Sequence, residues 1–147
     1  MAQHSVPVLL IPTAVGTVVV PSAAVCEVLP EVKLEPIPAA REWVLGYCIW
    51  RNTPVTVISF ERLSADDIAS IPIGRIVVMY PLPGRANHEY FAIAASHDPR
   101  SGFVESDTTS QPVPAQVGQR YIASATEING VVGLIPDFEA LKAAFYD

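Results

Sequence analysis

Charged residues are scarce in this sequence, and basic ones are the scarcer kind. Asp, Glu, Lys and Arg together make up only 16% of the 147 residues, and the formal net charge is −6. The nine basic residues are scattered along the chain. The sequence therefore lacks the basic patch with which proteins bind phosphate backbones or anionic lipid. We predict no nucleic-acid partner.

Cysteine is almost absent as well. Cys26 and Cys48 are the only two, which is too few for a disulfide framework, and their spacing is not that of a metal site. His4 and His88 likewise have no Cys, Asp or His partner at metal-ligand spacing. We predict reduced, buried cysteines, and neither a metal nor a cofactor.

No hydrophobic run is long enough to cross a membrane. The apolar stretch at residues 1–24 is interrupted by Pro7, Pro12 and Gly16, and no Lys or Arg precedes its apolar part. A signal peptide has a basic start and an unbroken apolar core, and a membrane helix needs about 20 apolar residues. We therefore expect two β-strands joined by a turn here, no membrane insertion, and a cytoplasmic protein.

Short runs rich in Val and Ile, each bounded by Pro or Gly, are what the sequence has in abundance. Hydrophobic residues make up 50% of the chain, and 14 prolines punctuate them. Short β-branched runs at regular spacing are typical of a β-barrel or sandwich. We predict an all-β domain. The predicted strands are residues 8–11, 17–20, 44–50, 55–60, 75–80, 90–95, 121–126 and 131–135.

Helix is expected only in short pieces. A brief turn is predicted after Pro21, and a second opens at Ser64, where Ser64 and Asp67 have the spacing of a capping box. The chain ends in a segment that Asp137 can cap, and in which the apolar side chains share one helical face. We predict a C-terminal helix whose apolar face packs on the β-structure.

Two features between the strands have distinct turn or loop chemistry. Residues 96–117 are rich in Ser, Thr, Asp and Pro, which predicts an irregular connection. The pair Asn129-Gly130 lies between two apolar runs, and both residues tolerate the positive φ of a tight hairpin turn. We therefore predict a β-hairpin over residues 121–135.

Ser96, His97 and Asp98 are the one place where a nucleophile, a base and an acid adjoin. Neighbours along a strand point to opposite faces, and catalytic triads are assembled from distant segments, so a polar loop is the favoured interpretation. A hydrolase that uses the loop 96–111 around His97 stays open as an alternative. So does a small-ligand-binding β-barrel, which would need a sizeable apolar cavity.

Arg51 is the most conspicuous charge, because it interrupts a strand-like apolar run. Its guanidinium stays charged and cannot be buried without a partner. It must therefore pair with an internal acid, such as Glu27 or Glu42, or point outward. The aromatic residues Tyr47 and Trp50 lie beside it, and Arg with aromatic residues is the composition of interface hot spots. We interpret this stretch as a docking surface.

Four segments, taken in order, resemble the CheW-like family of chemosensory coupling proteins over nearly the whole chain. They are VCEV at 25–28, PIPAAREWVLG at 36–46, GYCIWRNTPVTVI at 46–58, in which Arg51 is in register with the family's Arg, and VVGLIPDFEALKAAF at 131–145.

The resemblance implies a single domain over residues 1–147, made of two small five-stranded SH3-like β-barrels that share a hydrophobic core. It also implies an adaptor without catalytic activity that binds a CheA-type histidine kinase and a methyl-accepting chemoreceptor. Val25, Glu27 and Arg51 match the residues that the family uses toward the receptor. Tyr47, Trp50 and Asn52 are candidate supporting contacts. Whether Glu27 and Arg51 contact each other or a partner stays open.

The chain departs from the family pattern close to Arg51. Asn52 replaces a Gly, Ile49 replaces a polar residue, and Thr56 replaces a Pro, while Ser96 stands where an acid is common. These departures leave the fold in place but put the choice of partner in doubt. They indicate a variant from an alternative chemosensory array, such as one that controls type IV pili and twitching motility.

Overall fold

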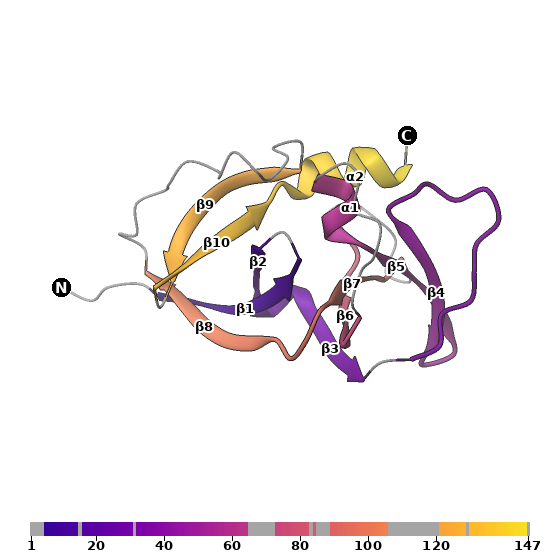
Figure 1. Cartoon of the computed structure of the whole chain (residues 1–147), viewed down its shortest axis with the longest axis horizontal. Coiled ribbons are helices and arrows are strands. Elements are labelled where there is room, and N and C mark those ends of the chain that lie inside the picture. The colour runs from indigo at the N-terminus through magenta and orange to yellow at the C-terminus, as the bar shows by residue number, and fades with distance from the viewer. Residues whose placement is uncertain are drawn as a thin grey trace.

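The computed structural model describes residues 5–14, 16–30, 32–64, 73–82, 84, 89–105, 121–128 and 130–146. Two five-stranded sheets make up most of it. Figure 1 shows them as two lobes side by side, with both α-helices above their junction. The predicted all-β fold with short helices is confirmed. Neither helix in these ranges has the length and apolar character needed to span a membrane.

The first sheet curls into a barrel in the order β8-β1-β2-β10-β9, and its two end strands also contact each other. Neighbouring strands are antiparallel except for β2 and β10, which are parallel. The strands are β1 (Ser5–Thr13), β2 (Gly16–Pro21), β8 (Arg100–Glu105), β9 (Ile122–Ile128) and β10 (Val131–Pro136).

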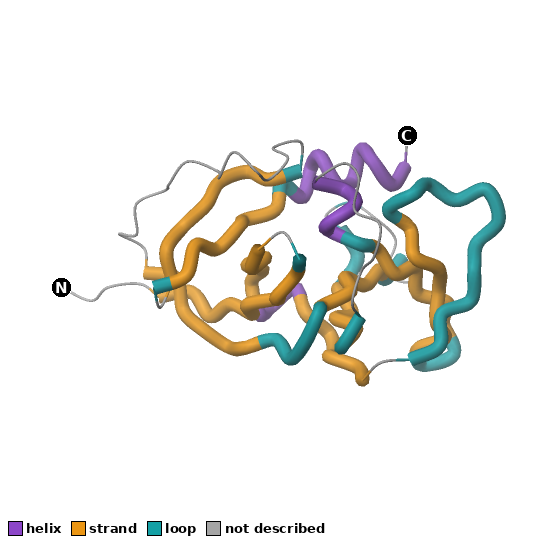
Figure 2. The backbone as a smooth tube through the Cα atoms, viewed as in Figure 1, coloured by secondary structure: helices purple, strands orange, loops and turns teal. Residues whose placement is uncertain are grey.

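The second sheet has the order β3-β6-β7-β5-β4, with β5 and β7 parallel. The strands are β3 (Val25–Pro30), β4 (Val44–Trp50), β5 (Thr53–Ile58), β6 (Arg75–Met79) and β7 (Phe91–Ala95). A short 3-10 helix, η1 (Ser22–Ala24), leads into β3 as predicted. A loop passes outside β4 (Figure 2), and Glu35 in it exchanges two backbone hydrogen bonds of 2.9 Å with Tyr47.

The two barrels are interleaved along the chain. The first barrel takes β1 and β2, the second takes β3 to β7, and the chain then returns to the first for β8 to β10. Neither barrel is therefore a continuous piece of sequence. The last three strands of the first barrel follow all five strands of the second barrel in the sequence.

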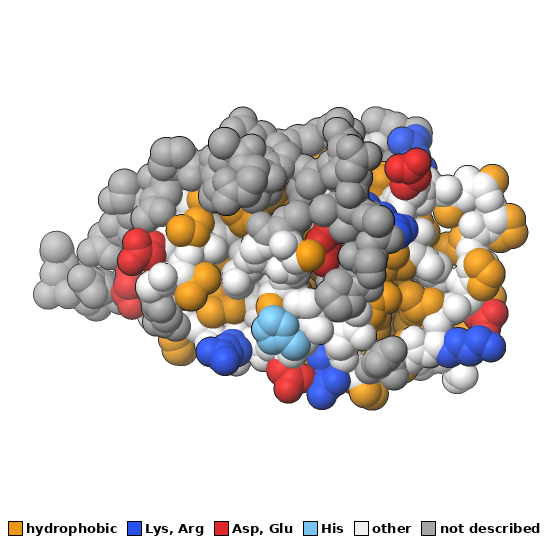
Figure 3. Space-filling view, viewed as in Figure 1, with side chains coloured by type: hydrophobic (Ala, Val, Ile, Leu, Met, Phe, Trp, Pro, Cys, Tyr) orange, Lys and Arg blue, Asp and Glu red, His pale blue; other side chains and the backbone are white. Residues whose placement is uncertain are grey.

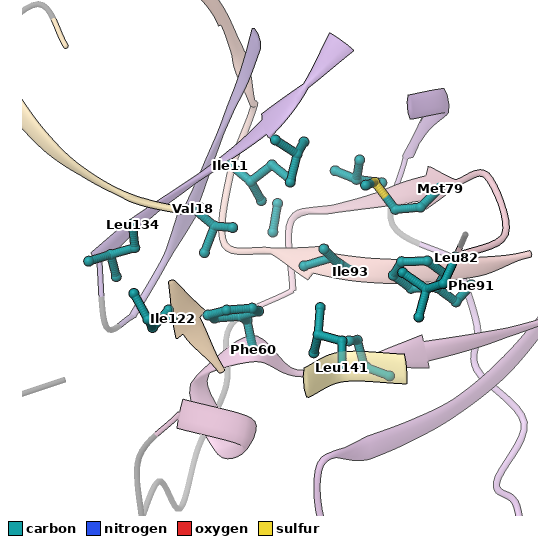
Figure 4. Close-up of a cluster of buried hydrophobic side chains, with 14 of the residues drawn as sticks. Ile11, Val18, Phe60, Met79, Leu82, Phe91, Ile93, Ile122, Leu134 and Leu141 are labelled. Atoms are coloured by element: carbon teal, nitrogen blue, oxygen red, sulfur yellow. The ribbon is translucent and has the colours of Figure 1, made fainter. Parts of the chain in front are cut away.

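One hydrophobic core joins the barrels. Ile11, Val18 and Leu134 come from the first barrel, and Ile93 from the second, while Phe60 lies between the two groups (Figure 4). Phe60 is completely buried. Burying a side chain of this size contributes about 1.5–3 kcal/mol, so the shared core holds the two barrels together.

The helices complete this junction. α1 (Phe60–Ser64) carries Glu61, whose carboxylate is fully buried and accepts hydrogen bonds from the Ala14 N–H (3.1 Å) and the Ser59 hydroxyl (3.2 Å). The hydrogen bond from Ala14 thereby joins the β1–β2 turn of the first barrel to α1. At α2 (Phe138–Tyr146), Asp137 Oδ1 caps the Ala140 N–H at 3.1 Å, and Leu141 is buried in the shared core. The predicted C-terminal helix is confirmed.

All eight predicted strands overlap observed ones, and β9 and β10 form the predicted hairpin. Asn129 of its turn lies outside the described residues. The strand prediction ran too far at Phe60, which begins α1. In α1 the Arg62 N–H donates a hydrogen bond to the Ser59 hydroxyl at 3.1 Å. The turn predicted to open at Ser64 depends on Asp67 and stays a prediction. Asp67 lies outside the described residues.

Two strands were missed. β3 was treated only as a motif, and β8 lies inside the segment 96–117 predicted as irregular. Both are end strands of their sheets. In β8 the buried position is Gly102, and the large apolar residue Phe103 is 61% exposed. Val104, two residues on, is half-buried against a small apolar cluster. The inward positions thus carry a Gly and one Val, a weak apolar signal, and pairing with β1 completes the strand.

Candidate docking site

An ion pair between Glu27 and Arg51 links the two end strands of the second barrel. β3 and β4 are furthest apart in the order of the sheet, and Arg51 immediately follows β4. Its Nη2 donates to Glu27 Oε1 at 3.3 Å. The side chains are 71% and 42% exposed. In this chain the two residues contact each other, and both remain accessible to solvent. A contact of either residue with a partner stays a prediction.

Arg51 lies in a turn, not on a strand as predicted. Arg51 and Asn52 form the two-residue connection between β4 and β5, with φ of 48° and 62°. Two successive positive φ values are typical of the type I′ turn, whose twist matches that of the flanking strands. The turn accounts for Asn52, because Asn tolerates this conformation better than most residues other than Gly.

This turn makes Asn52 a conformational residue as much as a candidate contact. We expect Asn52→Gly to leave the free energy of unfolding nearly unchanged, and Asn52→Val to lower it by about 1–2 kcal/mol, because a β-branched side chain is strained at positive φ. Urea unfolding of both variants would measure the difference. Equal stability of the two variants would contradict the assigned turn.

Aromatic rings support the guanidinium from below. The Arg51 Cζ lies 4.5 Å from the centroid of the Trp50 ring. Trp50 is only 7% exposed and packs edge-on against Tyr90, with ring centroids 5.1 Å apart. The Tyr90 ring is also tilted against the Tyr80 ring, with centroids 6.2 Å apart. Trp50 is thus a core residue whose ring holds the exposed Arg51 side chain in position. A cation over an aromatic face gains about 0.5–1 kcal/mol at exposed sites.

The other predicted residues lie on the same two strands. Val25 begins β3, is half-buried and packs against the shared core, two residues before Glu27. Tyr47 is half-buried on β4, further from the turn, where its backbone bonds to Glu35. The ion pair thus brings Glu27 together with Arg51, and the hairpin adds Trp50 and Asn52. Val25 and Tyr47 flank this group along the strands.

The second barrel also exposes two apolar side chains that were not among the predicted contacts. Ile49 is 63% exposed on β4, and Tyr80, after β6, is 50% exposed. Strand alternation could have indicated Ile49, because Cys48 and Trp50 on either side of it are buried. Hydrophobic side chains reach the surface of both lobes in Figure 3. Exposed apolar residues around an ion pair have the composition of a protein interface.

Both cysteines are free thiols, with Cys48 buried and Cys26 half-buried. Burial raises the pKa of Cys48. Burial also raises the pKa of Cys26, partly opposed by a hydrogen bond with Tyr80 and by the charge of Arg51. A raised pKa disfavours the reactive thiolate, so neither thiol has the environment of a nucleophile.

Ser96, His97 and Asp98 do not form a triad. The Ser96 hydroxyl donates to the Pro12 carbonyl at 3.1 Å and lies 3.0 Å from His97 Nδ1. Asp98 instead pairs with Arg75, at 2.7 Å from its Nε. The arrangement lacks the carboxylate that orients the histidine of a triad. Among the described residues, no three His, Cys, Asp or Glu are grouped so as to hold a metal ion.

Comparisons with known proteins agree with this architecture. The family model of the CheW-like domain matches residues 7–144. The crystal structure of the scaffolding protein TtCheW from Thermoanaerobacter tengcongensis superposes on this chain with a TM-score of 0.73 and 14% sequence identity. The match covers 92% of this chain and 86% of the TtCheW chain. At this identity the likeness shows a shared fold of two SH3-like barrels. No match was found among curated proteins.

Proposed function

From the premise that the chain belongs to the CheW-like domain family, we propose that it is a non-enzymatic cytoplasmic adaptor in chemosensory signalling. It joins a methyl-accepting chemoreceptor to a CheA-type histidine kinase, and the kinase docks through its own CheW-like domain. The observation that carries the proposal is the Arg51 guanidinium. It is 71% exposed and yet held in place by a left-handed turn and the Trp50 ring.

This arrangement suits an exchange of partners at Arg51. An exposed ion pair stabilises a fold by about 0–1 kcal/mol, so separating Arg51 from Glu27 costs the fold little. Guanidinium has five N–H donors and can bind a carboxylate through two parallel hydrogen bonds. A carboxylate of the partner can therefore take the place of Glu27 while the turn keeps its shape.

The surrounding surface supplies the apolar part of the interface. Ile49 and Tyr80 extend from β4 and from the end of β6, and Val28 on β3 is 39% exposed. Apolar side chains around a positioned charge resemble the hot spots of protein complexes. Val25, Glu27 and Arg51 are assigned to the receptor side, as the family resemblance implies, with Tyr47 and Asn52 as supporting contacts.

Replacing Arg51 tests the proposal. We expect Arg51→Ala to reduce the capture of the receptor or the kinase at least tenfold, because it removes the anchoring charge. Its melting temperature should fall by only a few degrees, because the ion pair and the cation–π contact that are lost are both exposed and weak. The assay is affinity capture from the native cell, with identification of the bound proteins and thermal melting of the purified variant.

Lys33→Ala is the matched control, because Lys33 is an exposed cation in the loop outside the same barrel. It should capture as much as the unmodified protein. Unchanged capture by Arg51→Ala would contradict the docking role. If the variant unfolds instead, Arg51 is a structural residue. The kinase recovered identifies the array, and we propose that it belongs to an alternative one, such as a type IV pilus system.

A further inference from the structure

A surface hollow lies in the first barrel, away from the β4–β5 turn. Its volume is about 330 Å³. Residues 97–101 border it on one side and the β9–β10 hairpin on the other, with β1 and β2 between them. The apolar lining consists of Leu10, Pro12, Ile128 and Val131. We call this the barrel hollow.

Leu10 and Ile128 lie beside the buried Gly102 in the wall of the barrel. A Cβ at the buried Gly102 would lie 3.4 Å from Leu10 Cδ1 and 3.7 Å from Ile128 Cγ2. Ile128 also packs with Val8 and Val19 in a cluster of its own, separate from the shared core. The barrel hollow therefore has a firm apolar floor and does not depend on the position of a single side chain.

Charge on the rim favours an anion. Arg100 and His97 both line the hollow and are exposed. Asp98 also lines the hollow, and its Oδ1 is paired with Arg75 Nε at 2.7 Å. Arg100 makes no ion pair with any residue that the structure describes. Figure 3 shows a His side chain at the lower edge of the molecule, with an acidic side chain directly below it and basic side chains to either side. The rim thus presents a guanidinium and an imidazole, with its one carboxylate already neutralised.

We propose that the barrel hollow binds an apolar monocarboxylate. The carboxylate pairs with Arg100, with His97 and Ser101 beside it, and a short aliphatic body lies on Leu10 and Ile128. Ligand sites are concave and mainly apolar with a few convergent polar groups, and they span about 300–1,000 Å³. At about 330 Å³ the hollow accepts one short body. The ligand is a free aliphatic acid or the carboxyl-terminal residue of a peptide.

Two probes distinguish these sources when titrated into the full chain and followed by amide chemical shifts. Hexanoate represents the free acid, and N-acetyl-leucine represents the end of a peptide. We expect saturable shifts at residues 97–101 and 128–131 with at least one of them. Hexanol and N-acetyl-leucine amide, which lack the charge, should bind at least tenfold more weakly, because they cannot form the charge-assisted hydrogen bond with Arg100.

Two exposed positions allow the site to be tested without disturbing the fold. Arg100→Gln should weaken the binding of the acid at least tenfold, and Val131→Ser should weaken it severalfold, while Lys33→Gln should have no effect. The proposal is overturned if neither acid gives saturable shifts, if Arg100→Gln binds as well as the unmodified chain, or if the uncharged probes match the acids. It stands independently of the adaptor role, because neither variant alters the Arg51 turn.

Discussion

Phe60→Ala is expected to lower the free energy of unfolding by about 3–5 kcal/mol, the range for deleting a buried aromatic side chain. Phe60 is completely buried at the start of α1, in the cluster to which both barrels contribute. The empty volume would lie at the junction, where the surrounding strands belong to different sheets. Both barrels should therefore lose stability together and unfold in one transition.

Urea unfolding followed by tryptophan fluorescence reports on the second barrel and the shared core, which contain Trp50 and Trp43. Amide hydrogen exchange in β9 reports on the first. Phe103→Ala is the matched control, because that ring is 61% exposed on an end strand and its loss should change stability by about 0.5 kcal/mol or less. Two separate transitions, or unchanged exchange in β9, would show that the barrels are not coupled through Phe60.

Gly46→Ala is expected to lower the free energy of unfolding by about 2–4 kcal/mol, from backbone strain and a clash together. Gly46 has φ of 142°, a conformation that side chains with a Cβ rarely adopt. A Cβ there would also lie 2.5 Å from the Glu35 carbonyl oxygen. That oxygen accepts the hydrogen bond from the Tyr47 N–H, so the loop outside β4 would have to move.

Gly130→Ala separates the two causes. Gly130 also has a positive φ, of 80°, but a Cβ there would meet nothing within 4 Å. The Gly130→Ala variant should lose only about 1–2 kcal/mol of stability, because it gains conformational strain without a clash. Denaturant unfolding of both variants measures the stability, and faster amide exchange at Glu35 and Tyr47 in Gly46→Ala alone would locate the damage. Equal losses in the two variants would mean that the contact with Glu35 is not tight.

Local chemistry was enough to predict much of the fold. Short Val- and Ile-rich runs bounded by Pro or Gly indicated eight of the ten strands, because an inward-facing apolar pattern is a property of the segment itself. The capping residue Asp137 indicated the C-terminal helix for the same reason. End strands were harder to find. β8 turns Gly102 and Val104 inward and exposes Phe103, so its largest apolar side chain lies on the outer face and hides the inward pattern.

The sequence was enough to predict which residues form the candidate site, but it did not predict how they are arranged. Glu27 and Arg51 stood out because isolated charges in apolar runs need partners. Their mutual contact joins residues 24 positions apart at opposite ends of one sheet, and only closure of the barrel brings them together. The turn at Arg51 was not predicted, because Arg seldom adopts a positive φ. Within the turn itself, Asn52 is the residue type that indicates such a conformation.

The sequence by itself determined the class of fold, most strands and the family, because these follow from periodicity, breakers and motif order within short segments. The tertiary structure decided the interleaving of the barrels, the shared core around Phe60, the ion pair that links β3 and β4, and the barrel hollow beside Arg100. Each of these depends on residues far apart in the chain. Such contacts form only when the whole chain buries its apolar surface together.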